Sequence, residues 1–238
     1  MKLAALIEPP PAEVRAEADL EFPAPYYARP IVVWIANAPM PVATSIRKRV
    51  FDIVVAGLAL VAFLPLLLVI GAAIWMESDG PVLFRQHRTG LHGRPFRIYK
   101  FRTMRVTEDG GDLRQATRGD GRVTPLGALL RHLSIDELPQ LVNVLRGEMS
   151  IVGPRPHALS HDVAWSRRAP GYGGRFRARP GLTGEAQVRG YRGEVSCDEA
   201  LLGRIEADNA YIDDWSFATD VRLFVRTIPL LLGDTRAF

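Results

Sequence analysis

Residues 53–76 read IVVAGLALVAFLPLLLVIGAAIWM, and the arrangement of the rest of the chain depends on this stretch. None of its 24 residues is charged, and fourteen of them are Leu, Ile, Val or Phe. A continuous helix of this length would reach roughly 36 Å, which is enough to cross the apolar core of a bilayer. The stretch therefore predicts a membrane helix. A helix buried on all sides in a protein core is the alternative.

Basic residues flank the apolar stretch on both sides. Residues 47–49 are all basic, and residues 80–107 contain seven Lys or Arg and no acid. Because positive flanks stay in the cytoplasm, both ends should lie on the same side, which one straight crossing does not allow. Pro65 lies near the middle, where a proline breaks the hydrogen-bond ladder and bends a helix. We expect residues 46–79 to form a re-entrant membrane helix broken at Pro65, with a single transmembrane anchor as the alternative.

Composition places the chain among folded proteins. It has 238 residues, 47% of them hydrophobic and 24% charged, and a net charge of +4. Its single cysteine, Cys197, excludes an intramolecular disulfide, and we expect it to be a small, semi-buried apolar residue. Residues 1–45 are rich in Pro and Ala without periodicity, which predicts an extended, flexible extension. We expect residues 80–238 to form a cytoplasmic catalytic domain with interfacial helices, and the whole fold to be mixed α/β and predominantly helical.

Two basic stretches, residues 80–107 and 165–180, contain no acid and create local positive fields. Next to a membrane helix they are suited to anionic lipid headgroups or to substrate phosphates. Nucleic acid is disfavoured, because no nucleic-acid-binding motif is present. Within the first stretch, residues 96–104 alternate apolar and basic side chains. This pattern predicts a short strand with Lys100 and Arg102 on one face as phosphate ligands.

The block RHLSIDELPQLVNVLRGEMSIVGPRP at residues 131–156 contains the adjacent carboxylates Asp136 and Glu137. Ser134 and Glu137 fit a capping box, and apolar residues follow at helical spacing, so we expect a helix to start at the pair. The two acids would complement the helix dipole, which is the simplest explanation of their position. The same dipole would stabilise an ionised Asp136 as a nucleophile or metal ligand.

Adjacent carboxylates need cations nearby if both are to stay ionised. An Mg²⁺ ion carrying a diphosphate would supply this charge. Arg131 lies about one turn before the pair, and the Gly-Pro-Arg-Pro sequence at 153–156 is a rigid turn that presents Arg155. The sequence thus predicts a phosphoryl-transfer site. Its expected catalytic residues are Asp136 and Glu137, and its expected phosphate ligands are Lys100, Arg102, Arg131 and Arg155.

These motifs together resemble the bacterial sugar transferase family, whose members are monotopic phosphoglycosyl transferases. The resemblance extends from about residue 48 to residue 226 and departs from the family in two places. Leu64 precedes Pro65 where the family often has Ser, and Glu185 stands where relatives often have Trp. The matching motifs are KRVFD at 48–52, YKFRTM at 99–104, SIDELPQLVNVLRGEMSIVGPRP at 134–156, RPGLTGEAQVRGYRGE at 179–194 and WSFATDVRLFVRT at 215–227.

The resemblance implies transfer of a hexose 1-phosphate from a UDP-sugar to undecaprenyl phosphate at the inner membrane, which initiates exopolysaccharide synthesis. We expect the sugar to be glucose rather than galactose. Asp136 would attack the β-phosphate, release UMP and carry an aspartyl phosphosugar, with Glu137 as proton acceptor or metal-site partner. The resemblance also implies Mg²⁺ at Asp136. Membrane lipids are the other expected partners. The sequence is compatible with either a monomer or a homo-oligomer. Two alternatives remain: a non-catalytic membrane adaptor that gathers lipids or partners through its basic face, and a conventional glycosyltransferase, which would release UDP.

Overall fold

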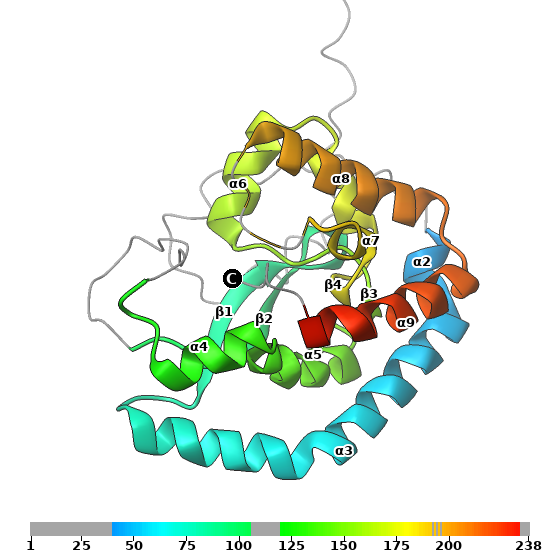
Figure 1. Ribbon diagram of the computed structural model, residues 1–238. Coiled ribbons are helices and arrows are strands. Elements are labelled where there is room, and N and C mark those ends of the chain that lie inside the picture. The colour runs from blue at the N-terminus through cyan, green and yellow to red at the C-terminus, as the bar shows by residue number, and fades with distance from the viewer. Residues whose placement is uncertain (1–39, 106–119, 192, 194, 196, 234–238) are drawn as a thin grey trace, which may run out of the picture. The chain divides into compact units, whose positions relative to one another are not determined.

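The computed structural model describes residues 40–105, 120–191, 193, 195 and 197–233. Most of the described chain is helical, and two small sheets complete it (Figure 1). The predicted mixed, predominantly helical fold class is confirmed. The α-helices are α2 (Pro41–Thr44), α3 (Ile46–Glu77), α4 (Pro125–His132), α5 (Leu141–Arg146), α6 (Leu159–Arg168), α7 (Glu185–Val188), α8 (Asp198–Asp213) and α9 (Phe217–Gly233).

The strands form one antiparallel hairpin and one short parallel pair. The hairpin consists of β1 (Leu83–Thr89) and β2 (Pro95–Phe101), and the parallel pair of β3 (Ser150–Val152) and β4 (Gly181–Thr183). The strand predicted within residues 96–104 is therefore present, but it ends before Arg102. Three 3₁₀ helices connect these elements: η3 (Leu91–Gly93), η4 (Ile135–Gln140) and η5 (Tyr172–Arg177).

The long helix α3 bends along its length and contains Pro65 (Figure 1). A proline inside a helix lacks an N–H and clashes with the preceding turn, which accounts for a bend. The first half of α3 packs on the main core through Phe51 and Val55. The second half packs through Ile70 and Ile74 against β2 and α4. Both halves of α3 thus contact the same domain.

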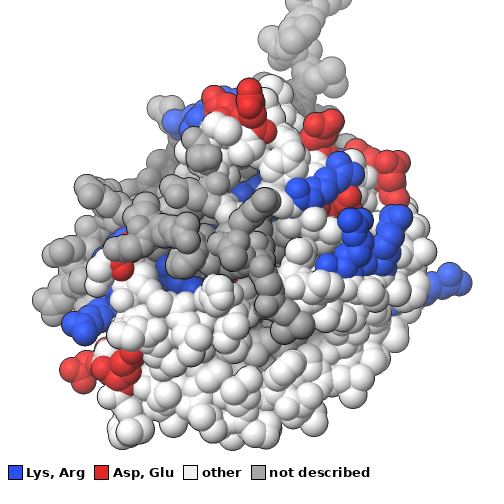
Figure 2. Space-filling model, viewed as in Figure 1, with Lys and Arg blue, Asp and Glu red and all other residues white. Residues whose placement is uncertain are grey.

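The outward face of α3 is apolar and uncovered. Val61 and Trp75 are 75% and 73% exposed, and Leu58 and Leu68 are also largely exposed. In Figure 2, the lower part of the molecule, where α3 lies in Figure 1, is mostly free of charged side chains. Most of the charged side chains in this view lie above it. Within the part of the chain that the structure describes, α3 is the one helix long and apolar enough to cross a membrane. A face of this kind is suited to lipid rather than water.

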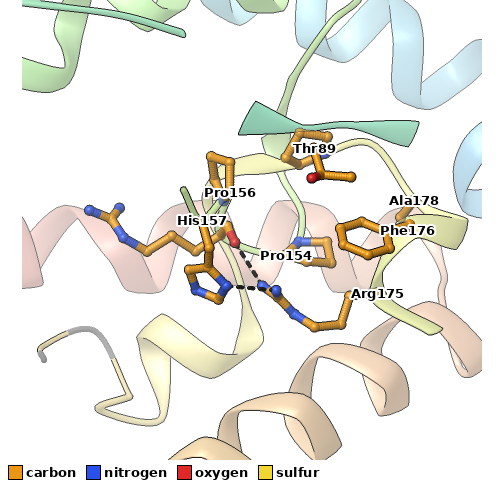
Figure 3. A pocket seen from close by; sticks show the side chains of 9 residues that line it. Thr89, Pro154, Pro156, His157, Arg175, Phe176 and Ala178 are labelled. Carbon is orange, nitrogen blue, oxygen red and sulfur yellow. Dashed lines mark hydrogen bonds between the residues drawn. The ribbon is translucent and has the colours of Figure 1, made fainter. Parts of the chain in front are cut away.

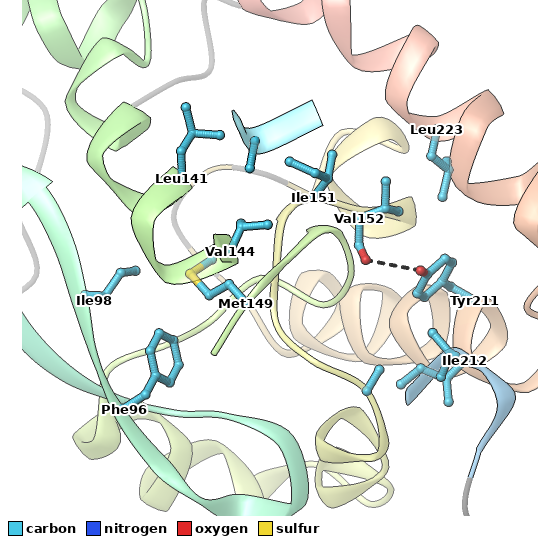
Figure 4. Packing of buried hydrophobic residues seen from close by; sticks show 13 residues of the cluster. Phe96, Ile98, Leu141, Val144, Met149, Ile151, Val152, Tyr211, Ile212 and Leu223 are labelled. Atoms are coloured by element: carbon cyan, nitrogen blue, oxygen red, sulfur yellow. Dashed lines mark hydrogen bonds between the residues drawn. The ribbon is translucent and has the colours of Figure 1, made fainter. Parts of the chain in front are cut away.

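The main core lies where the hairpin, α5, β3, α8 and α9 meet. Figure 4 shows Phe96 and Ile98 of β2 facing Val144 of α5, with Leu223 of α9 on the other side of the cluster. Val144 and Val152 are completely buried. Burying a side chain of this size contributes about 1.5–3 kcal/mol. This cluster packs β2 and β3 against α5, and both strands lead into candidate site residues.

Two predictions, for residues 41–44 and for Cys197, are wrong. Residues 41–44, placed in the extended segment 1–45, form α2, because Pro41 starts the helix and the apolar Val42 packs into the main core. Residues 1–39 of that segment lie outside the described residues. Cys197 was expected to be semi-buried, but it is exposed, because it occupies the N-cap position at the surface end of α8.

Candidate functional site

The carboxylate pair lies in η4, directly after a backbone reversal. Ser134 adopts a left-handed conformation with φ 56° and makes no side-chain cap hydrogen bond. The chain then forms a 3₁₀ helix rather than an α-helix, and α5 begins only at Leu141. A helix does start at the pair, as predicted, although its first part is 3₁₀ in type; the predicted capping box is wrong. Pro139 explains part of the difference, since it has no N–H with which to bond the carbonyl four residues back.

Asp136 is 7% exposed, and its carboxylate accepts no hydrogen bond from the described residues. Nζ of Lys100 lies 4.0 Å from its Oδ2. Burial raises the pKa of Asp136 to about 6; Lys100 acts in the opposite direction, and the charge of Glu137 adds to the rise. The group is thus mostly ionised at neutral pH and keeps its lone pairs available. An ionised, uncommitted carboxylate beside cations is suited to nucleophilic attack.

Glu137 has a different environment from its neighbour. Its Oε1 accepts from Lys100 Nζ and from Arg155 Nη2, each at 2.6 Å, and its Oε2 accepts from Arg155 Nη1 at 3.1 Å. Burial raises the pKa of Glu137, but the charges of Arg155 and Lys100 outweigh it and hold the pKa well below its usual range. Glu137 is therefore a fixed anion that holds two cations. The adjacent acids are chemically unequal.

Lys100 reaches the pair because Asn143 attaches β2 to α5. The buried Asn143 accepts from the backbone N–H of Tyr99 at 3.1 Å and donates to the carbonyl of Arg97 at 2.7 Å. Its amide also donates to Glu148 at 2.7 Å. These bonds hold the last residues of β2 beside η4. The sequence analysis missed Asn143, whose signal would have been a polar residue inside an apolar helical stretch.

Arg155 follows β3 in a turn that permits no side chain at its first residue. A Cβ at Gly153 would lie 2.3 Å from the carbonyl oxygen of Arg179. The carbonyl of Arg155 accepts from Nη2 of the buried Arg175 at 2.7 Å, and Nε of Arg175 is 2.8 Å from Asp208. The turn is thus anchored from behind to α8. The sequence analysis included Arg175 only as one charge in a basic stretch and did not identify this anchoring role.

The other two predicted phosphate ligands are placed differently. Arg131 donates from Nε to Thr103 Oγ1 at 2.8 Å, and its positive charge lowers the pKa of Asp136, so it lies near that carboxylate. Arg102 is not brought to the carboxylate pair. It is buried at the C-terminal end of α3, where it donates to the carbonyl of Ser78 and, at 3.1 Å, to Ser78 Oγ. Its position is that of a helix C-cap ligand.

A small cavity lies behind the Arg155 turn, and neither Asp136 nor Glu137 lines it (Figure 3). His157 lies at its wall, with Nδ1 2.9 Å from Arg175 Nη1 and 2.8 Å from Tyr172 Oη. Its Nε2 is 3.2 Å from Arg204 Nη1. Burial and the charges of both arginines hold the pKa of His157 well below its usual range. The ring is a neutral link within the scaffold behind the turn.

The second basic stretch is largely used within the protein. Four of its five arginines bind protein groups, which offsets most of the predicted positive charge. Arg175 binds Asp208, Arg177 binds Asp213, Arg168 binds Asp198, and Arg179 donates to the carbonyls of Gly147 and Ala43. Three of these partners lie on α8, so the stretch mainly attaches α8 to the domain.

Within the described ranges, no group of three or more His, Cys, Asp or Glu could hold a metal ion. A divalent ion at this site would therefore need ligands from its substrate. The free carboxylate of Asp136 fits Mg²⁺ under that condition, because Mg²⁺ commonly takes one or two carboxylates together with phosphate oxygens and waters. Glu137 is less suited, since both its oxygens are bonded to cations.

The amino-acid sequence is similar to that of a known protein family. Residues 43–234 match the model of the family described as bacterial sugar transferase. A Caulobacter vibrioides protein named UDP-glucose:undecaprenyl-phosphate glucose-1-phosphate transferase is 56% identical over 203 residues, which cover 85% of this chain and 76% of that one. An Escherichia coli protein of the same name is 44% identical over 197 residues, covering 83% of this chain and 42% of the relative.

A third relative is matched over nearly its whole length. The exopolysaccharide production protein PSS of Rhizobium leguminosarum is 40% identical over 197 residues, which cover 81% of this chain and 98% of the relative. The chain thus spans less than half of the Escherichia coli relative and most of the other two.

Proposed function

Because the chain belongs to the bacterial sugar transferase family, we propose that it transfers glucose 1-phosphate from UDP-glucose to undecaprenyl phosphate and so initiates exopolysaccharide synthesis. The donor, acceptor and reaction are those in the names of the Caulobacter and Escherichia coli relatives, and exopolysaccharide production is in the name of the Rhizobium relative. The observation that supports the mechanism is the inequality of the carboxylate pair. Asp136 is uncommitted, whereas Glu137 is bonded to Lys100 and Arg155.

In the proposed first step, an Asp136 oxygen attacks the β-phosphorus of the donor. The new bond is between that oxygen and phosphorus. The bond between phosphorus and the bridging oxygen breaks, and its electron pair leaves with UMP. An oxygen of undecaprenyl phosphate then attacks the same phosphorus and releases Asp136. Lys100, Arg131 and Arg155 stabilise the charge on the transferred phosphoryl oxygens, since such transfer depends mainly on positioning and electrostatics.

Glu137 acts in this scheme as a positioning residue rather than as the proton acceptor suggested by the family resemblance. Its low pKa makes it a weak base. The acceptor is a phosphate monoester whose second pKa is about 6, so the attacking oxygen needs no base at neutral pH. Glu137 instead fixes the positions of Lys100 and Arg155. Mg²⁺, held by Asp136 and the donor diphosphate, would neutralise charge on the phosphates.

We further propose that α3 enters the inner membrane and returns to the same side. Near its start, Lys48 binds Asp220 of α9 at 2.9 Å. At its end, Ser78 binds Arg102, which follows β2. Both attachments belong to one domain, which a helix crossing the bilayer could not contact at both ends. The catalytic residues would then face the cytoplasm beside the membrane.

Cysteines introduced at Arg47 and Gly80 should react with an impermeant reagent from the same side, and labelling from opposite sides would refute this topology.

Nucleotide release tests the reaction class. Purified protein in nanodiscs is incubated with a panel of UDP-sugars and Mg²⁺, with and without undecaprenyl phosphate. We expect UMP from UDP-glucose, and lipid-linked glucose when the acceptor is present. UDP as the product would indicate ordinary glycosyl transfer. No release with any donor, from protein shown to be folded, would favour the membrane adaptor.

A further inference from the structure

Arg88, near the end of β1, is a partly buried arginine without a carboxylate ligand among the described residues. Its Nη2 donates to Oε1 of Gln86 at 2.6 Å, while its Nε is buried and has no hydrogen-bond partner. A buried charged donor without an acceptor is unfavourable, because it has lost its hydration without replacement. Nothing in the roles assigned above accounts for this residue. The unfilled donor points to a ligand from outside the protein.

The hairpin register places Arg88 on the face that carries Lys100. Arg88 pairs with Phe96, and opposed residues of an antiparallel pair lie on the same face. Lys100 lies four residues further along β2, an even number, so it lies on that face too. Lys100 contacts Glu137 there. The backbone of Arg88 also bridges to Ala158, just after the turn that holds the second cation on Glu137.

The charges around Arg88 leave it in need of an anion. Its pKa is lowered to about 10, first by burial and then by the positive charge of Arg155, while Asp162 and Glu137 act in the opposite direction. These two acids have other partners. Glu137 is bonded to two other cations, and Asp162 accepts from Tyr172 at 2.5 Å. A bound phosphate would give the neighbouring guanidinium groups of Arg88 and Arg155 a shared counter-charge.

The hairpin register indicates which phosphate this would be. Lys100 Nζ lies 4.0 Å from Asp136 Oδ2. Arg88 is paired with Phe96, four residues and about 13 Å along β2 from Lys100, and its backbone bridges to Ala158 just after the Arg155 turn, so it lies farther from Asp136, towards that turn. We propose that Arg88 binds the donor phosphate that leaves with the nucleoside, and neutralises the charge that this phosphate gains as its bond to the transferred phosphorus breaks. This inference rests on the proposed function for the identity of the leaving group, UMP.

The test is direct binding of UMP and of uridine to the full chain in nanodiscs, measured by calorimetry without turnover. The variant is Arg88→Gln, with Arg88→Lys as a second variant that keeps the charge. Arg85→Gln is the matched control, because Arg85 is exposed and an odd number of residues from Arg88 on the same strand, so it lies on the other face. Loss of a charge-assisted bond predicts UMP affinity about 10–100-fold weaker in Arg88→Gln. Arg88→Lys should be intermediate, and Arg85→Gln should stay within twofold of the wild type.

Uridine separates a phosphate contact from a structural effect. If Arg88 binds phosphate, uridine affinity is the same in all four proteins. Equal UMP affinity in Arg88→Gln and the wild type would overturn the inference, as would a parallel loss of uridine affinity, or a wild type that binds no UMP. If Arg88→Gln does not fold, an unchanged UMP affinity in Arg88→Lys overturns it. Arg88-dependent UMP binding by a wild type that releases no UMP from any UDP-sugar would overturn the proposed function and leave this inference standing.

Discussion

Replacing Asp136 by Asn should abolish activity and raise stability, and the gain in stability should depend on pH. The carboxylate of Asp136 is buried and accepts no hydrogen bond from the described residues. Its ionised form is therefore less favourable in the folded protein than in the unfolded chain. Asparagine has similar volume and no charge. It removes the nucleophile and the cost of burying the charge in one change.

The size of the effect follows from the pKa. A rise from 3.8 to about 6 corresponds to about 3 kcal/mol, at about 1.4 kcal/mol per pKa unit. Because the folded pKa is the higher one, the stability that the neutral form contributes is present below pH 3.8 and is lost as the pH rises through 6. The wild type carries the whole cost at pH 8 and about half of it at pH 5. At about 2–4 °C per kcal/mol, Asp136→Asn should unfold about 6–12 °C higher at pH 8 and about half that at pH 5.

The assay is thermal unfolding in one detergent at pH 5 and pH 8, together with UMP release from UDP-glucose. Glu137→Gln is the matched control, because its pKa is shifted in the opposite direction. Removing one member of a buried ion pair should destabilise by about 3–5 kcal/mol, equally at pH 5 and pH 8, since Glu137 is ionised at both. UMP release by Asp136→Asn at the wild-type rate would refute the assignment of Asp136 as the nucleophile. A difference in unfolding temperature that does not change with pH would refute the reasoning about the buried charge.

Three further predictions follow from the geometry of the site. kcat/KM for UDP-glucose should fall as the pH drops below about 6, approaching tenfold per pH unit, because protonated Asp136 does not attack; a profile of UMP release that is flat down to pH 5 would contradict this. Gly153→Ala should lower the unfolding temperature and activity together, because its Cβ would lie 2.3 Å from a carbonyl oxygen; an unchanged melting curve would show that the turn relaxes. Asn143→Ala should destabilise by about 1–3 kcal/mol for each buried partner left without a bond and should lower kcat, and wild-type kcat would argue against a role in placing Lys100.

The candidate site could be predicted from the sequence to the extent that its motifs are local. Asp136 and Glu137 are adjacent, and the turn around Arg155 is set by glycine and proline within four residues. Lys100, Glu137 and Arg155 do come together, although no local pattern specifies their distances. Which carboxylate is free could not be predicted. That difference arises from tertiary contacts, which hold one acid and leave its neighbour without a bond.

Other expectations failed where the partner of a residue lies far away in the sequence. Alternation predicts a strand but does not specify its last residue, and Arg102 lies beyond it, bound to the end of α3. The basic stretch at 165–180 contains no acid, yet Arg175 pairs with Asp208, 33 residues later. Local charge density predicts a positive surface there. Only the packing of α8 shows that three of these arginines pair with its carboxylates.

The two ends of α3 are attached close to the two segments that hold Lys100 and Arg155, the proposed phosphate ligands. Lys48 donates to the carbonyl of Val152 at 2.8 Å, three residues before Arg155. Arg102, which binds the end of α3, is two residues after Lys100. A shift of α3 relative to the domain would therefore move both cations that hold Glu137. The phosphate of a lipid-anchored acceptor lies at a fixed depth relative to the membrane surface. The site that binds this phosphate must therefore be held at the same depth. If α3 enters the membrane as proposed, direct attachment of both cation-bearing segments to this helix would set that depth.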